Sequence, residues 1–299
     1  MTANTQTTQS KPRAFFARIK KKAKFHTPFF AIPYALLIVL FILIPLGIIL
    51  VRSFMTHDGY FTFDNFAYFF SSSSIARTLG NSVLIAVLTT LGCLLLTYPI
   101  ALVLSNSKFN KSAILVLLFI LPMYVNFMLR TFAIRTLLDM LNIGASTAGA
   151  TEANQLVRIV VAHIYDFFPF MLLPIYTCMI NIDKSYAEAS NDLGASSTKT
   201  FLRITLPLSM PGVISGVLMV FMPTLSMFAV RDLVVVGREW IMIGNIIYDL
   251  MGGGPAAIES NIGAAFSVIL LTLVAAIMVG ANRLSALSNK KQRQQGGAL

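Results

Sequence analysis

Long apolar runs constrain this chain more than any other feature of its sequence. A helix needs roughly 20 apolar residues to cross the hydrocarbon core of a bilayer, and six runs in the 299-residue chain approach or exceed that length. Charged residues make up only 12% of the chain and its mean hydropathy is +0.76, which excludes an ordinary soluble domain. We therefore predict an all-α, polytopic membrane protein with six transmembrane helices. These helices are expected at about 28–51, 81–104, 112–134, 156–180, 211–230 and 262–284.

Prolines interrupt five of the six runs. Membrane helices tolerate proline where neighbouring groups satisfy the freed backbone carbonyls. Kinked helices that leave room for a pathway are the expectation.

The lysines are distributed on one side of the predicted topology. Positive residues near span ends are retained in the cytoplasm, and every lysine falls in a terminal tail or in the loops on the same side as both tails. We therefore expect both termini in the cytoplasm, with basic tails at residues 1–27 and 285–299 and the membrane domain at 28–284. The segments expected to face outward hold most of the acidic residues.

Several function classes receive no support from the sequence. The formal charge of +11 does not indicate a nucleic-acid partner, because lysine and arginine cluster in tails and short loops between apolar runs. Cys93 and Cys178 each lie inside an apolar run, so neither a disulfide framework nor a metal spacing is expected. The chain has no Walker sequence and no catalytic or metal constellation in its spacing, so any energy coupling must come from a partner chain.

The loop at residues 183–210 is too long and too patterned to be a simple connector. Ser185 and Glu188 have the S-x-x-E spacing of a capping box, and Gly194 offers the left-handed residue that ends a helix. A second helix is expected to follow and to stop at Pro207, which lacks the backbone N–H needed to continue it. The pattern predicts a helical pair that projects from the membrane.

This loop resembles the EAA loop of binding-protein-dependent ABC importer permeases, whose pattern is E-A-A-x₃-G-x₉-I-x-L-P. The spacing is complete, and one departure is Ser190, where the pattern prefers a second alanine. The resemblance implies a type I ABC importer permease whose loop docks in a groove of a cytoplasmic ATPase. The alternative is an ordinary amphipathic hairpin on the membrane surface, since short motifs occur by accident. The coupling residues implied are Glu188, Ala189, Gly194, Ile204, Leu206 and Pro207.

The resemblance extends over about residues 81–284 and is greatest to the permease B subunits of spermidine/putrescine importers. It implies a polyamine substrate, a second similar permease, an ATPase dimer holding ATP and Mg²⁺, an extracytoplasmic binding protein, and a place in the bacterial inner membrane. This chain departs from the pattern at Tyr124, where the family often has tryptophan, and at Asp166, where a neutral residue is expected. The stretches that carry the resemblance are 121–126, 129–130, 169–176, 192–196, 231–233 and 243–245.

Asp166 is the clearest functional candidate inside a predicted span, where an ionisable residue is costly to bury. It lies among aromatic residues, so an ammonium group would meet a carboxylate together with cation–π attraction of roughly 0.5–2 kcal/mol per ring. The alternatives are a structural pair with Arg130 or Arg135, or a bond to His163 one helical turn away.

Three further residues are candidates for contact with a cation. Asp232 closes the fifth span beside Arg231, with an interfacial ion pair as the alternative. Tyr124 and Asn126 follow the kink expected at Pro122 and are candidates to line a pathway, although an aromatic belt position is the alternative for the tyrosine. The candidate substrate-binding residues are therefore Asp166, Asp232, Tyr124 and Asn126.

The function implied is import by alternating access, driven by a partner ATPase, with a polyamine as substrate. The same scaffold would also suit an anion, served by Arg130, Arg135 and Arg231, or an amino acid. A channel or membrane enzyme that works without an ATPase is a further alternative, which the EAA spacing opposes.

The predicted topology is testable by cysteine labelling in intact cells. Cysteines placed at Lys108 and Lys290 should be protected from an impermeant reagent, whereas those at Asp58 and Glu152 should react. External reactivity at position 108 would overturn the six-span topology.

Overall fold

The computed structural model describes residues 27–105, 113–144, 151–237, 239–253 and 260–296. Residues 1–52 and 53–299 form two compact units. Among the described residues the backbone is helical apart from turns, loops and one antiparallel bridge between Met55 and Phe61, which confirms the all-α prediction. The basic tail at 1–26 and the loop lysines Lys108 and Lys111 lie outside the described residues.

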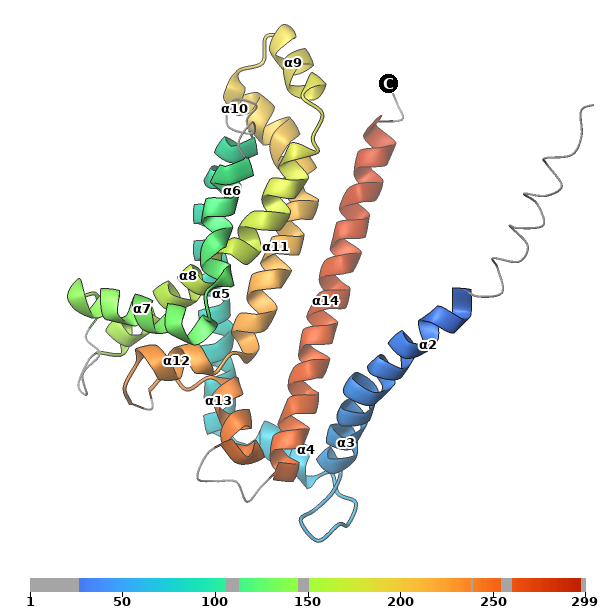
Figure 1. The fold of residues 1–299 in the computed structure, drawn as a ribbon, viewed down its shortest axis with the longest axis vertical. Helices are drawn as coiled ribbons and strands as arrows, with labels where there is room; N and C mark the ends of the chain where they lie inside the picture. The colour runs from blue at the N-terminus through green and yellow to red at the C-terminus, as the bar shows by residue number, and fades with distance from the viewer. Residues whose placement is uncertain (1–26, 106–112, 145–150, 238, 254–259, 297–299) are drawn as a thin grey trace, which may run out of the picture. The chain divides into compact units, whose positions relative to one another are not determined.

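The first unit contains one apolar helix with a wide turn in its middle. It consists of α2 (Thr27–Ile38), the π-helical turn η1 (Val39–Leu43) and α3 (Ile44–Ser53) (Figure 1). In η1 the N–H of Ile44 donates to the carbonyl of Val39, five residues back. Pro45 follows immediately, and a proline ring clashes with the carbonyl four residues before it. The wider turn relieves that clash while the helix continues.

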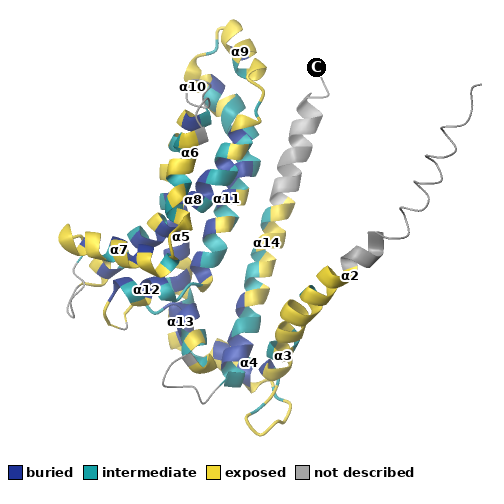
Figure 2. Cartoon of the chain, viewed as in Figure 1, coloured by how far each residue is buried: buried dark blue, intermediate teal, exposed yellow. Residues whose placement is uncertain are grey.

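Three long helices form the core of the second unit. They are α5 (Ser73–Ser105), α8 (Glu152–Ile180) and α11 (Leu206–Ser226), and Figure 2 shows their buried residues facing one another. A Cβ on Gly212 of α11 would lie 2.7 Å from the carbonyl oxygen of Pro174, so only glycine allows this close approach to α8. The residues that fill this part of the core include Cys93, Met171, Leu172, Ile175 and Val220.

The remaining helices surround this core. The helix α14 (Ser260–Gly296) packs beside α11, and α4 (Asp64–Ser71) packs against α14. The others are α6 (Ala113–Ile120), η2 (Leu121–Tyr124), α7 (Phe127–Met140), α9 (Ser185–Asp192), α10 (Ser197–Thr200), η3 (Phe201–Thr205), α12 (Ala229–Val234), α13 (Ile243–Tyr248) and η4 (Asp249–Gly253).

The third apolar run is broken, whereas the sequence predicted one continuous span at 112–134. The helix from Ile114 to Tyr124 and the helix α7 meet at an angle of 98°, and Figure 1 shows α7 lying across the direction of α5 and α6. By length and composition, five helices of the described chain are able to cross a membrane, and a sixth crossing requires this bent pair to count as one span.

The helix at the start of α11 does not stop at Pro207, and that prediction is wrong. Residues 197–226 form one helix, in which α10 passes through the π-helical turn η3 into α11. The N–H of Leu206 donates to the carbonyl of Phe201, five residues back, directly before Pro207. This is the same device as in η1, because the wide turn again removes the clash with the proline ring. The helix then ends at Ser226, before the predicted end at 230.

Candidate functional site

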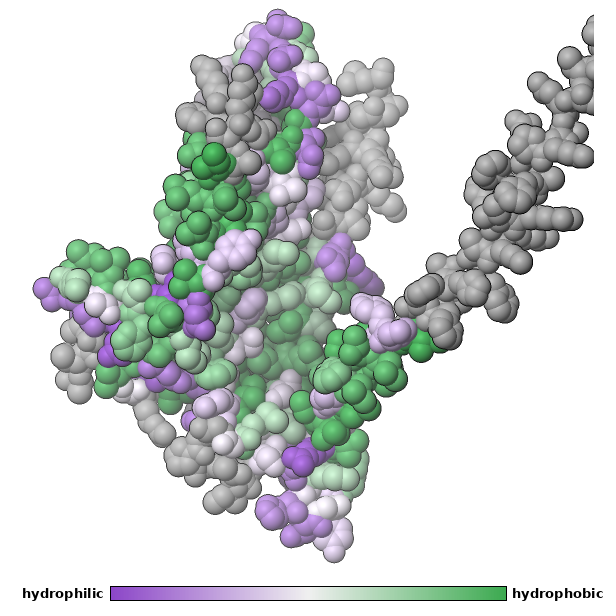
Figure 3. Space-filling model, in the orientation of Figure 1, coloured by the Kyte–Doolittle hydropathy of each residue, from purple (hydrophilic) through white to green (hydrophobic). Residues whose placement is uncertain are grey.

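The projecting pair, α9 and α10, lies at one end of the second unit, where hydrophilic residues gather (Figure 3). Its first helix begins without the predicted capping box. Lys184 stands at the cap position with helical backbone angles, whereas a side-chain cap needs an extended residue there. The carboxylate of Asp183 instead accepts the backbone N–H of Ser185 at 3.0 Å. This bond lowers the pKa of Asp183 below its usual range.

The helix α9 ends in a Schellman turn around Gly194. The φ angle of Gly194 is +77°, the N–H of Ala195 donates to Ser190 at 3.0 Å, and the N–H of Gly194 donates to Asn191 at 2.9 Å. The predicted left-handed conformation is confirmed. A Cβ at this position would meet no atom within 4 Å, so a larger residue strains the backbone without a clash.

A hydroxyl pair joins the two helices of the projecting pair. The oxygens of Ser190 and Thr200 lie 2.9 Å apart, and both residues are buried. Ser190 stands where the EAA pattern has alanine, so this chain has a hydrogen bond that an alanine cannot make. Glu188 and Ala189, on the same helix, are exposed.

The projecting pair connects to the bundle through two helices. The continuous helix 197–226 carries it into α11. The hydroxyl oxygens of Tyr98 and Ser209 lie 2.9 Å apart, and the Tyr98 ring meets the ring of Phe201 edge-on at 5.9 Å, which ties α5 to the same helix. The predicted coupling residues Ile204, Leu206 and Pro207 lie half-buried in η3 and α11.

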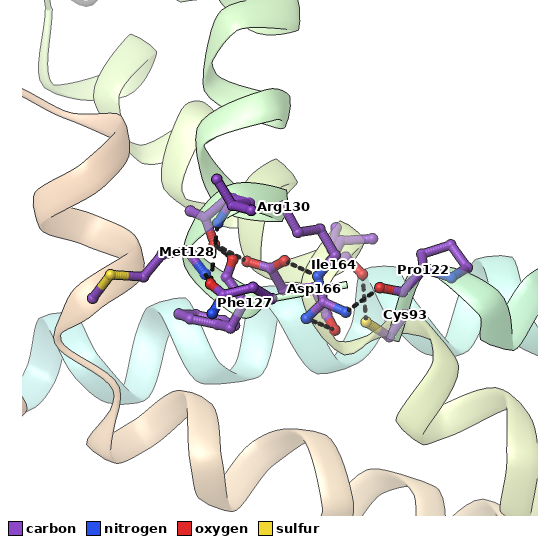
Figure 4. A network of polar contacts seen from close by, with 10 residues as sticks. Cys93, Pro122, Phe127, Met128, Arg130, Ile164 and Asp166 are labelled. Atoms are coloured by element: carbon purple, nitrogen blue, oxygen red, sulfur yellow. Dashed lines mark hydrogen bonds and ion pairs between the residues drawn. The ribbon is translucent and has the colours of Figure 1, made fainter. Parts of the chain in front are cut away.

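Asp166 is fully buried and both of its carboxylate oxygens are bonded. Figure 4 shows its side chain pointing toward Arg130, whose Nε lies 2.7 Å from one oxygen. The hydroxyl of Thr131 donates to the other oxygen at 2.9 Å. The structure therefore places Asp166 in the ion pair with Arg130 that the sequence left open. His163 does not bond to it, and its Nδ1 instead lies 2.8 Å from the carbonyl of Ile159.

Arg130 also holds the bend between η2 and α7. Its two terminal nitrogens donate to the carbonyls of Pro122 and Asp166, each at 3.2 Å. Asn126 caps α7, because its side-chain oxygen accepts the N–H of Met128 at 2.9 Å. Tyr124, at the end of η2, is 80% exposed.

Arg158 fixes the other end of α7, and sequence reasoning missed it. This side chain is fully buried, lies 2.6 Å from a carboxylate oxygen of Asp139, and donates to the carbonyls of Gly144 at 2.7 Å and Val234 at 3.1 Å. Arg135 adds a bond from α7 to the carbonyl of Leu233 at 2.9 Å. The sequence did contain a signal for Arg158: it is an arginine near one end of an apolar run, where a charged residue is costly to bury and needs partners.

Asp232 keeps an exposed carboxylate. It accepts from Arg231 at 2.9 Å and from the side-chain amide of Asn245 at 2.8 Å, yet the side chain is 46% exposed. One turn away, the rings of Phe228 and Tyr248 stack with their centroids 4.5 Å apart. These two rings also line an apolar cavity of about 700 Å³ between α11, α13 and α14. The side-chain amide of Asn245 links the two features, because it donates both to Asp232 and to the backbone carbonyl of Phe228 at 3.3 Å.

This chain is similar to known proteins both in sequence and in fold. No family model matches the chain. The spermidine/putrescine transport system permease protein PotB of Haemophilus influenzae is 31% identical over 270 residues, which cover 85% of this chain and 92% of that protein. PotB of Escherichia coli is 31% identical over 271 residues, which cover 85% of this chain and 96% of that protein.

A solved structure shares the fold. It is a bacterial ABC transporter involved in the import of the acidic polysaccharide alginate, with a TM-score of 0.67 and 17% identity. The match covers 90% of this chain and 98% of that chain. At this identity the likeness concerns the fold alone.

We expect Asp166→Asn to destabilise the protein by about 3 kcal/mol, because it leaves the buried Arg130 without its counter-charge. The measurement is the melting temperature of the purified protein. The double change Arg130→Met with Asp166→Leu, which removes both charges, should lose less than Asp166→Asn alone. An unchanged melting temperature in Asp166→Asn would contradict the structural assignment.

We expect Gly194→Val to weaken association with an ATPase, because valine at a φ of +77° distorts the turn that closes α9. Gly59→Val is the matched control, since Gly59 has a φ of +82° and equally open space but belongs to the loop before α4, and Figure 1 shows α4 at the end of the second unit opposite α9. Both changes should strain a turn, and only the first should reduce co-purification of the ATPase. Equal co-purification of the ATPase with both variants would show that the turn at Gly194 has no part in ATPase association.

Proposed function

Because this chain belongs to the PotB family of ABC importer permeases, we propose that it carries polyamines across the bacterial inner membrane as one permease subunit of a larger importer. The observation that carries this proposal is 31% identity over 92% of the Haemophilus influenzae PotB, which is a spermidine/putrescine transport system permease protein. The apolar helices agree with a multi-pass membrane protein. In this proposal the assembled importer also contains a second permease, an ATPase dimer and an extracytoplasmic binding protein.

The projecting pair supports the coupling role. Tyr186 and Leu193 are 56% and 89% exposed at its surface, beside the exposed Glu188, so an apolar and acidic surface is offered to a partner. In the proposed orientation this end faces the cytoplasm, where the ATPase closes on ATP. The continuous helix 197–226 then conveys the displacement into the bundle without an intervening loop.

The exposed carboxylate of Asp232 is the proposed contact for the cation. Its two hydrogen-bond partners hold it in place, and each oxygen of an ionised carboxylate has further capacity to accept an N–H. The stacked rings of Phe228 and Tyr248 supply apolar faces for the methylene segments and cation–π attraction for the ammonium groups. Tyr124 and Asn126 are proposed to border the pathway at the bend, with Asn126 also serving as the cap of α7.

Asp166 is proposed to position other residues and not to contact the substrate. Its oxygens are taken by Arg130 and Thr131, so a substrate would have to displace a buried ion pair to reach it. Its role is to hold α7 across the bundle.

The anion alternative loses the residues that favoured it. Arg130 is paired with Asp166, Arg231 with Asp232, and Arg135 donates to the carbonyl of Leu233. Arg130 and Arg135 are bonded within the chain. In the third pair the Arg231 side chain is 8% exposed and that of Asp232 46%, so the pair presents its carboxylate to a solute and not its guanidinium.

The decisive experiment is uptake of radiolabelled spermidine and putrescine by the reconstituted importer with and without ATP. We expect ATP-dependent uptake that unlabelled polyamine suppresses and that neither an amino acid nor an anionic oligosaccharide suppresses. ATP-dependent uptake of one of those other solutes, with no polyamine uptake, would overturn the proposed substrate.

Within that assay, Asp232→Asn should raise the half-saturating polyamine concentration about tenfold, because one charged hydrogen bond to an ammonium group is lost. The control is Asp58→Asn, which removes an exposed carboxylate from another loop. Assembly and basal ATP hydrolysis should stay unchanged in both variants. Equal uptake kinetics in the two would move the substrate contact away from Asp232.

A further inference from the structure

A polar pocket lies at the end of the bundle opposite the projecting pair. It has a volume of about 370 Å³ and is lined by the start of α5, the first residue of α8 and residues 239–241. It shares no lining residue with the cavity beside Phe228 and Tyr248. None of the residues assigned to substrate contact above lines it.

The pocket combines two carboxylates with an indole. Trp240 is half-buried, and its indole N–H donates to the backbone carbonyl of Glu152 at 2.7 Å, which fixes the ring against the start of α8. Arg77 lies 3.9 Å from a carboxylate oxygen of Glu152 and balances that charge. Within the described chain Glu239 forms no ion pair. The described lining residues therefore carry one negative charge in excess.

An organic ammonium suits these groups better than a metal ion. Hard cations such as Ca²⁺ require six or more oxygen ligands, and no group of three His, Cys, Asp or Glu side chains suited to a metal occurs in the part of the chain that the structure describes. An ammonium group pairs with a single carboxylate, and tryptophan is the aromatic side chain that attracts cations best. Asn81, which also lines the pocket, offers an amide oxygen for a remaining N–H.

We propose that the pocket lined by Glu239, Trp240 and Glu152 is an entry site for an ammonium group of a polyamine, occupied before the substrate reaches Asp232. This inference rests on the proposed function and on the orientation that places the projecting pair in the cytoplasm. The pocket then opens where substrate arrives. Because its carboxylates are exposed, binding is weak, fast and sensitive to salt, as suits a site that must release its ligand inward.

The chain supplies its own reporter for this site. Trp240 is its only tryptophan, so tryptophan fluorescence of the purified full-length chain comes from this pocket alone. We expect spermidine, titrated at constant ionic strength into the chain in lipid nanodiscs, to change the fluorescence in a saturable way. Glu239→Gln should raise the half-saturating concentration about two- to fivefold. Asp58→Asn, the matched loss of an exposed carboxylate outside the pocket, should leave it unchanged.

The outcomes separate this inference from the proposed function. No saturable change, an equal response to Mg²⁺, or equal affinity in wild type and Glu239→Gln would contradict the proposal that this pocket binds an ammonium group. If the assembled importer nevertheless takes up polyamine, the proposed function stands without the pocket. A saturable response that Glu239→Gln weakens, in an importer that moves no polyamine, supports the binding site and overturns the transport assignment.

Transport supplies a second readout in the assembled importer. Glu239→Gln should raise the KM for spermidine uptake while the maximal rate stays the same, because an entry site affects capture more than later steps. Trp240→Phe, which keeps an aromatic face, should affect KM less than Trp240→Leu. A fall in maximal rate with unchanged KM would contradict an entry site.

Discussion

The buried ion pair between Arg130 and Asp166 is the interaction on which the bend in the membrane bundle depends. A break in a helix frees backbone carbonyls, and the hydrocarbon core offers no water to satisfy them. Arg130 bonds the carbonyl of Pro122 directly before the break and the carbonyl of Asp166 on α8, so it ties the bend to α8, while the Asp166 carboxylate neutralises its charge. With Asn126 capping α7 at one end and Arg158 holding it at the other, the bent arrangement is fixed at several points.

The continuity of residues 197–226 has consequences for how the chain would work. A helix that ended at Pro207 would leave a joint between the projecting pair and the bundle. The π-helical turn before that proline keeps the helix intact, and the close approach at Gly212 packs it directly on α8. In the proposed mechanism a push on the projecting pair therefore reaches the helices that surround the pathway.

The acidic residues divide into two groups by burial. Asp166 is closed off because its counter-ion lies inside the protein with it, which stabilises the arrangement and excludes a ligand. Asp232 and Glu239 are exposed, so their carboxylates remain accessible to a cation, and Glu239 lines its pocket together with Trp240. The sequence showed the hydrophobic surroundings of Asp166 and named Arg130 as one alternative partner, but it could not show that this residue of another helix, 36 positions away, lies in contact with it.

The sequence by itself determined the helical membrane class, the family and the turn at Gly194. Each of these depends on residues that are neighbours along the chain: an apolar run long enough to span, the spacing of the EAA pattern, and one position that needs a positive φ. It placed Asn126 at a kink but did not show that the chain would turn by 98° there. Only the tertiary structure decided that bend, the passage of the helix through Pro207, and the pairing of each buried charge. The physical reason is that these depend on which donors and carbonyls a neighbouring helix presents, and in a medium without water those partners must come from distant parts of the chain.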